Sequence, residues 1–200
     1  MTPALQTERL HLSRYVAGFV LDRHVEWLND PEVVKYSEQR HKQHTEASQH
    51  KYLNEFPGES HIWLIKIVEH PDPPPPLRGG PIHYTDIGTI TAYIDEPNRL
   101  ANMGIMIGEK ETWGQGYGLE AWTAVMDRLF TKAGIRKIEA GMMVENFPMK
   151  SICSRSDMVY DGYRREHFLL DGRPVDLVYY GLTDVQYHHN KKAKTTSCFP

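Results

Sequence analysis

Hydrophobic and polar positions alternate near the start of the chain and then change their period. Residues 9–13 alternate between polar and apolar side chains, which predicts a strand with one buried face. Apolar residues then recur at helical spacing over 16–28, and Asp30-Pro31 ends that pattern. We therefore expect a helix over 16–28 and a second short helix from Pro31.

Further helix and strand signals follow. Thr45 suits the N-cap of an amphipathic run that reaches Phe56, and Pro57-Gly58 stops that run. The β-branched run 62–68 predicts a strand. The segment 70–81 holds four consecutive prolines, which favour an extended, exposed loop between two strands. A docking ligand for SH3-type domains is the alternative interpretation of this segment.

The second half of the chain has the clearest periodicity. A helix that begins at Gly118 shows one apolar face, and Gly134 suits its left-handed C-terminal cap. Asp171-Gly172 is typical of a hairpin turn. The expected elements are an antiparallel hairpin of strands 87–94 and 100–107, further strands over 135–144, 159–170 and 175–182, and helices over 118–133 and 146–156.

Composition narrows the class of protein. The 200 residues are 40% hydrophobic and 24% charged, which fits one globular domain over 1–183 followed by a polar, frayed tail over 184–200. A net charge of -3 argues against nucleic-acid and anionic-membrane partners. No apolar stretch approaches the roughly 20 residues that span a bilayer, so we expect a cytoplasmic protein. Cys153 and Cys198 lie far apart, which predicts neither a disulfide framework nor a metal site.

A glycine-rich turn carries the strongest chemical signal. Gly114, Gly116 and Gly118 alternate between the strand that ends at Ile107 and the next helix. Glycine lets a ligand approach backbone N–H groups and a helix N-terminus adds positive charge, so the turn suits a phosphate or pyrophosphate. A turn that binds nothing is the alternative. A Walker loop is excluded because Leu119 follows Gly118, and a dinucleotide fold is disfavoured because too few residues remain for more parallel strands.

The segment around this turn resembles a known family. The sequence Trp113-Gly114-Gln115-Gly116-Tyr117-Gly118-Leu119-Glu120-Ala121 is similar to the cofactor loop of the GCN5-related N-acetyltransferase (GNAT) superfamily, with the ribosomal-protein alanine acetyltransferase-like branch as the nearest form. The likeness extends from Thr7 to Leu182, and Asn146 matches the asparagine that opens the helix after the fifth strand. The resemblance implies an α+β fold. Its mixed, mostly antiparallel sheet has about seven strands, the fourth and fifth splayed apart, and about four flanking helices.

The resemblance also implies acetyl-CoA as co-substrate and no metal. Backbone groups of the fourth strand would align the pantetheine arm, the glycine-rich turn would hold the pyrophosphate, and Asn146 would bind the pantetheine while capping its helix. The implied cofactor-binding residues are Ile105, Met106, Ile107, Trp113, Gly114, Gln115, Gly116, Tyr117, Gly118 and Asn146.

Four positions depart from the family pattern. Trp113 replaces the usual Arg or Gln, and Asp157 replaces a glycine before the sixth strand. Asn102 stands where many relatives carry a glutamate, and Cys153 takes the place of a tyrosine that often serves as general acid. The departures concern the catalytic acid and base more than the cofactor loop.

Candidate catalytic residues follow from the resemblance. Glu38 or His41 would remove the proton from the amine, and Cys153 would protonate the leaving thiolate. The alternatives are that Glu38 and His41 are surface residues while water acts as base, and that Cys153 is a small buried residue with Ser154 as its nearest substitute. The next candidate bases are Asp95 and Glu96.

These features predict an acyl-CoA-dependent N-acetyltransferase in which an amine attacks the acetyl thioester directly. The acceptor would be a primary amine of a small molecule, an amino sugar or a protein N-terminus, and a homodimer is one option for the assembly. The alternative is a GNAT-like domain that binds acyl-CoA as a sensor or scaffold without turnover. We expect no nucleic-acid or membrane partner.

Overall fold

A single sheet organises the molecule, whose computed structural model describes residues 4–16, 21–56, 61–69 and 83–196. Its strands are β1 (Leu5–Gln6), β2 (Leu10–Arg14), β3 (His61–Glu69), β4 (His83–Asp95), β5 (Leu100–Ile107), β6 (Lys137–Met143), β7 (Val159–Leu170) and β8 (Arg173–Thr183). They lie in the order β1-β2-β3-β4-β5-β6-β8-β7. Every neighbouring pair is antiparallel except β5 and β6, which are parallel.

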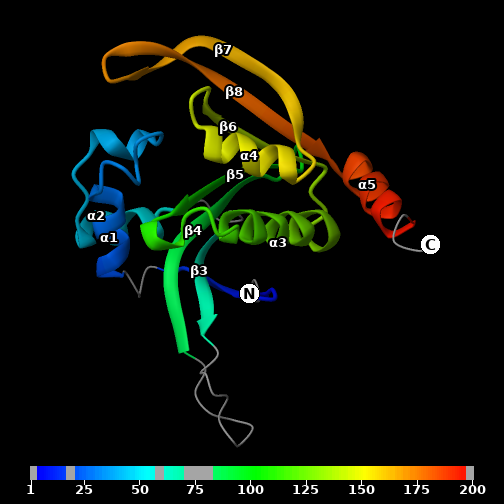
Figure 1. The fold of residues 1–200 in the computed structure, drawn as a ribbon, viewed down its shortest axis with the longest axis horizontal. Coiled ribbons are helices and arrows are strands. Elements are labelled where there is room, and N and C mark those ends of the chain that lie inside the picture. Colours follow the sequence, from blue (N-terminus) through cyan, green and yellow to red (C-terminus); the bar gives the residue numbers. More distant parts are fainter. Residues whose placement is uncertain (1–3, 17–20, 57–60, 70–82, 197–200) are drawn as a thin grey trace, which may run out of the picture.

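The helices form two groups around this sheet. The α-helices are α1 (Asp22–Asn29), α2 (Glu46–Asn54), α3 (Tyr117–Lys132), α4 (Phe147–Arg155) and α5 (Asp184–Thr196), and the 3₁₀ helices are η1 (Glu38–His41) and η2 (Lys110–Thr112). Helices α3 and α4 lie next to each other over the middle of the sheet, whereas α1 and α2 gather near the ends of β4 and β5 (Figure 1).

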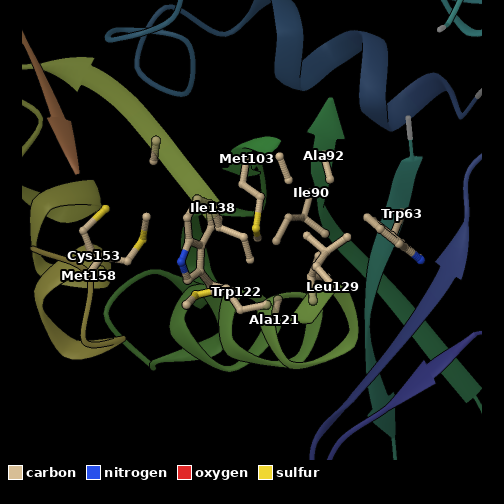
Figure 2. Packing of buried hydrophobic residues seen from close by; sticks show 14 of the residues in the cluster. Trp63, Ile90, Ala92, Met103, Ala121, Trp122, Leu129, Ile138, Cys153 and Met158 are labelled. Atoms are coloured by element: carbon tan, nitrogen blue, oxygen red, sulfur yellow. The ribbon is translucent and has the colours of Figure 1, made fainter. Parts of the chain in front are cut away.

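The main core lies between α3 and one face of the sheet. Trp122 and Leu129 of α3 point toward Ile90, Met103 and Ile138 of three different strands (Figure 2). Trp122 is fully buried, which matches the apolar face that the helical periodicity predicts. Because each strand alternates its side chains between two faces, the intervening residues point to the opposite side of the sheet.

The parallel pair β5 and β6 separates soon after it begins. Pairing joins Leu100–Asn102 to Lys137–Glu139 and stops there, although β5 continues to Ile107 and β6 to Met143. The edge of β5 that faces β6 therefore has no strand partner beyond Asn102. This confirms the splayed strands that the family resemblance implies.

Most elements lie where the sequence predicts them. Thr45 caps α2 in a reciprocal capping box with Ser48. The helix predicted over 16–28 begins later, at Asp22, and the second helix expected from Pro31 is a series of turns followed by η1. The proline-rich segment 70–81 lies outside the described residues.

The prediction of a frayed tail from Asp184 is wrong for the described part of the chain. Residues 184–196 form α5, in which the Tyr187 ring stacks on Phe130 at a centroid distance of 4.7 Å. The Tyr187 hydroxyl also donates a hydrogen bond to Asp127 of α3. The expected count of about seven strands and four helices becomes eight strands and five α-helices within the described residues, because β1 and α5 were not anticipated.

Candidate active site

The glycine turn, residues 113–118, joins η2 to the N-terminus of α3. Gly114 and Gly116 adopt left-handed backbones with φ of 75° and 85°. Gly116 is the N-cap of α3, and it supplies no side chain to bond the free N–H groups of the first helical turn. These donors are thus left for a ligand, at the positive end of a helix of 16 residues.

Trp113 and Trp27 fix the turn against the end of β5. The indole Nε1 of Trp113 donates a hydrogen bond to the carbonyl of Ile107 at 2.8 Å. The ring of Trp27, on α1, packs directly over Gly108, where an added Cβ would lie 2.1 Å from the indole. Only glycine fits at position 108, so β5 ends in a position set by helix α1.

Arg9 holds the turn from the other side. Its Nη1 donates to the carbonyl of Gln115 at 3.1 Å, and its guanidinium lies 4.4 Å from the centre of the Tyr117 ring. Its Nε donates to Glu120 at 2.7 Å. Burial alone would raise the pKa of the Glu120 carboxyl, but hydrogen bonds from Thr7 and Arg9 outweigh burial and hold that pKa below its usual value. The Arg9 guanidinium, paired with the Glu120 carboxylate, therefore stands beside the glycine turn.

The sequence alone does not point to a role for Arg9, which is a polar residue at the start of the first predicted strand. The contact joins residues that are more than a hundred positions apart, and no local pattern reports it.

The glycine turn, β5 and α4 converge at Gly118. A Cβ at this position would lie 3.2 Å from Ile152 of α4, 3.7 Å from Ile107 and 4.0 Å from Ile105. At the start of α4, Asn146 Oδ1 accepts a hydrogen bond from the Met149 N–H at 3.2 Å, which confirms the predicted N-cap. The structure thus packs α4, the helix that Asn146 caps, against the glycine turn and β5.

A second feature is a cavity of about 470 Å³ on the opposite face of the sheet, here named the α2 cavity. Its walls come from α1, η1, α2 and the strands β3 to β5. The lining residues are His24, Leu28, Ser37, Gln39, Lys42, His44, Ser48, Gln49, Tyr52, Ile62, Thr89, Thr91, Tyr93, Gly104, Ile105 and Met106. It therefore reaches the same stretch of β5 that the resemblance implicates in cofactor binding.

The alternation of β4 explains the chemical contrast between the two faces. Ile90 and Ala92 are fully buried in the main core, whereas Thr89, Thr91 and Tyr93 line the α2 cavity. Gly104 of β5 pairs with Thr91. A Cβ at Gly104 would lie 3.2 Å from the Thr91 hydroxyl, so the glycine leaves space in the cavity beside Thr91.

His44 is held in place by hydrogen bonds at its ring and its backbone. Its Nε2 lies 3.1 Å from the carbonyl oxygen of Gln39, which can only accept a hydrogen bond, so Nε2 carries the proton. Its Nδ1 lies 3.1 Å from the Gln49 amide nitrogen and accepts from it. Asn29 bonds the His44 backbone at both its N–H and its carbonyl, at 2.8 and 2.9 Å. Both ring nitrogens are therefore engaged, and His44 serves as a wall of the cavity.

His24 is neutral. The Tyr15 hydroxyl accepts from the Leu21 N–H at 3.2 Å and shares a hydrogen bond with His24 Nδ1, 3.0 Å away. Burial, with a smaller contribution from His44, lowers the pKa of His24 to about 4. The imidazole is uncharged at neutral pH.

Two tyrosines close one side of the cavity. The hydroxyls of Tyr52 and Tyr93 lie 2.6 Å apart, and Phe56 packs edge-on against Tyr52 at 5.4 Å. Burial, followed by the hydrogen bond with Tyr93, raises the pKa of the Tyr52 hydroxyl far above its ordinary value. Both groups are thus neutral hydrogen-bonding partners.

The structure places the candidate bases outside this cavity. Glu38 Oε1 is 2.8 Å from Arg40 Nη1, and Glu38 Oε2 is 3.7 Å from His41 Nε2. The side chains of Glu38 and His41 are 52% and 56% exposed. Asp95 bonds Asn98 within the turn after β4, so its role there is structural. None of these residues lines the cavity.

Cys153 is buried in the main core. Its side chain lies on α4 near Met158 and below the sheet (Figure 2), and it is 0% exposed. Burial raises the pKa of the thiol to about 12. The structure thus contradicts Cys153 as the acid that protonates a departing thiolate, and it supports the alternative of a small buried residue. Ser154, its nearest substitute, is exposed.

Two of the departures from the family pattern have a visible consequence. Asp157 adopts a left-handed backbone with φ of 64°, a conformation that glycine takes at lower cost. The Asn102 amide donates to Glu139 of β6 at 3.3 Å, where β5 and β6 begin to separate. A carboxylate is therefore present beside Asn102, and it comes from the neighbouring strand.

The residues that the structure describes hold no group of three or more His, Cys, Asp or Glu side chains that could bind a metal ion. Within the same ranges, no helix has the length and apolar character needed to cross a membrane.

Comparison by sequence identifies a family. The family model described as an acetyltransferase (GNAT) domain matches residues 9–159. An uncharacterized N-acetyltransferase, p20 of Bacillus licheniformis, is 29% identical over 94 residues, which are 47% of this chain and 52% of that protein. The chain thus matches about half the length of this curated relative.

Comparison of structures supports the same fold. A RimL ribosomal L7/L12 α-N-protein acetyltransferase in complex with coenzyme A superposes with a TM-score of 0.73 at 15% identity, covering 90% of this chain and 98% of that chain. A spermidine N-acetyltransferase from Vibrio cholerae in complex with CoA and spermine gives 0.74 at 18% identity, covering 91% and 99%. At such low identity these likenesses establish the fold.

Proposed function

Because the chain belongs to the GNAT acetyltransferase family, we propose that it transfers an acetyl group from acetyl-CoA to a primary amine. The observation that carries this proposal is the meeting of the glycine turn, the unpaired edge of β5 and the α2 cavity at residues 104–107. An acyltransferase needs a cofactor site and an acceptor site that open on one reacting centre, and β5 borders both.

The residues of the first site fit coenzyme A. Gly114 and Gly116 keep side chains away from the donors at the start of α3, and the Arg9 guanidinium, which is paired with Glu120, lies beside them. This arrangement suits a pyrophosphate. The residues proposed to hold the cofactor are those implied by the resemblance, namely Ile105, Met106, Ile107, Trp113, Gly114, Gln115, Gly116, Tyr117, Gly118 and Asn146, together with Arg9.

The proposed reaction is direct. Coenzyme A supplies the acetyl thioester, the amine nitrogen forms a bond to the acetyl carbon, and the carbon–sulfur bond breaks. The amine loses one proton and the thiolate gains one. Backbone N–H groups on the unpaired edge of β5 would polarise the carbonyl, and the neutral walls of the α2 cavity would receive the amine.

The proton transfers need no side chain of the α2 cavity as a strong base. The low pKa of His24 makes it a weak base, and both ring nitrogens of His44 are hydrogen-bonded within the protein. Glu38 and His41 lie outside the cavity. We therefore favour ordered water as the carrier of the amine proton. The non-catalytic alternative, an acyl-CoA sensor or scaffold, stays open because the candidate acid Cys153 is buried.

One experiment separates transfer from binding alone. The purified protein is mixed with acetyl-CoA and a panel of primary amines, and the free thiol of released coenzyme A is measured. We expect amine-dependent release and an N-acetylated product by mass spectrometry. Stabilisation by coenzyme A without any release would favour the sensor. The cytoplasmic location and the homodimer stay predictions.

A further inference from the structure

We propose that the acceptor is a primary amine that also carries an anionic group, a phosphate or a carboxylate, and that polyamines are poor acceptors. This inference rests on the proposed function and assigns the α2 cavity as its acceptor site. The geometry points to it through the charge of the cavity lining.

Among the described residues that line the α2 cavity, Lys42 is the one Lys, Arg, Asp or Glu. Burial lowers the pKa of His24 to about 4, and the two ring nitrogens of His44 are occupied by Gln39 and Gln49. None of the ion pairs formed by the described residues involves Lys42, so its ammonium is available to a ligand at the C-terminal end of η1.

The carboxylates nearest in the chain lie outside the lining of the α2 cavity. Glu38, on η1, is paired with Arg40 at 2.8 Å. Glu46, on α2, lies 3.5 Å from His50. Glu139, on β6, accepts from Asn102 at 3.3 Å. Within the described part of the chain, the lining itself therefore offers no carboxylate to the ammonium groups of a polycation.

The charge of the cavity also affects the reactivity of the amine. A positive neighbour and a desolvated site both lower the pKa of a bound amine, and the neutral amine is the nucleophile. A second or third ammonium group in a polyamine would be desolvated without a carboxylate partner, which is costly. The same lining therefore favours a monoamine and opposes a polyamine.

The uncharged part of the lining selects a polar acceptor. Ser37, Ser48, Thr89, Thr91 and the Tyr52–Tyr93 pair present hydroxyl groups, and Gln39 and Gln49 add amides. Such groups bind hydroxyls or amides of a ligand, since each can donate and accept. The lining thus fits a small hydroxylated or amide-bearing amine whose anionic group meets Lys42.

The test compares matched amines that differ in one anionic group. Glucosamine 6-phosphate is compared with glucosamine, and L-alanine with L-alaninamide, which separates a phosphate from a carboxylate as the anionic group. Spermidine is the polycationic probe. We expect kcat/KM for at least one anionic amine to exceed that for its neutral partner and for spermidine by about tenfold.

Variants connect that preference to Lys42. Lys42→Met should lower kcat/KM for the preferred anionic amine by about fivefold or more, while it leaves the neutral partner nearly unchanged. Lys51→Met is the matched control, because Lys51 is an exposed lysine of α2 outside the cavity lining. It should change neither amine.

A binding measurement accompanies the kinetics. The preferred anionic amine should raise the melting temperature of the wild-type protein without acetyl-CoA, and spermidine should not. Equal or better use of spermidine, equal use of the neutral partner, or an unchanged preference in Lys42→Met would overturn the inference. If no amine releases thiol although coenzyme A binds, the proposed transfer is wrong, and the binding measurement still decides the charge of the ligand.

Discussion

The glycine turn and the α2 cavity border the same strand and are built in opposite ways. The turn presents backbone N–H groups, and its ligand site depends on the left-handed conformation of glycines within six consecutive residues, 113–118. The α2 cavity presents side chains from three helical elements and three strands. A site made of backbone suits a ligand that every relative shares, whereas a site made of side chains can differ from one relative to the next. Under the proposed function, this contrast leads us to expect the common chemistry in the turn and the specificity in the cavity.

The largest expected effect concerns Gly116. Gly116→Val forces a β-branched residue into a left-handed conformation and puts its side chain beside the donors of α3. We expect the affinity for coenzyme A to fall at least about 100-fold, measured as the loss of its thermal stabilisation. Gly134→Val is the control, since Gly134 has a φ of 67° at the other end of α3. That variant should be destabilised by a similar strain and keep the coenzyme A response.

A second prediction concerns the loss of stability at low pH that His24, in the wall of the α2 cavity, should cause. His24 has a folded-state pKa of about 4 against 6.5 for the free side chain, so the unfolded chain binds more protons between these values. Its contribution to stability is complete above pH 6.5 and is lost as pH falls toward 4. The loss amounts to about 3 kcal/mol for a shift of this size.

Replacing His24 tests this assignment. Urea unfolding from pH 7 to pH 4 should show a shallower loss of stability in His24→Gln than in the wild type. The exposed His41 serves as the control, and His41→Gln should leave the slope unchanged. A wild-type slope in His24→Gln would mean that other groups cause the acid sensitivity.

The third prediction concerns α5, which contacts neither site. Tyr187→Ala removes the ring that stacks on Phe130 and should cost about 1–2 kcal/mol of stability. Coenzyme A should still stabilise the variant by the same increment. His189→Ala, an exposed position on the same helix, should be neutral. Loss of the coenzyme A response in Tyr187→Ala would show that α5 supports the cofactor site.

The smallest effect is expected at the candidate bases. Because Glu38 and His41 lie outside the α2 cavity, Glu38→Gln and His41→Asn should change kcat by less than about tenfold and keep the acidic limb of the pH profile. Measurement of kcat across pH for both variants decides the point. A fall of about 10²-fold or more with loss of that limb would restore one of them as the general base.

Most of the fold was predicted from patterns whose residues lie close together in the sequence. The antiparallel pair β4 and β5, the apolar face of α3 and the cap at Thr45 depend on residues close in sequence. The α5 prediction failed because 184–196 is polar overall and its helix is held by Phe130 and Asp127 of another element. A helix that is held by a few contacts with one other element needs few apolar residues, so its sequence shows little apolar periodicity.

By itself, the sequence determined the order of the elements and the glycine turn, because a turn that needs left-handed glycines and a helix N-terminus is encoded within a few neighbouring residues. Only the tertiary structure decided which side chains line the α2 cavity. It buried Cys153, turned Glu38 toward Arg40, and joined His24, His44 and Lys42 around one cavity. The alternation of a strand fixes that two faces exist, but the helices packed on each face decide what those faces contain.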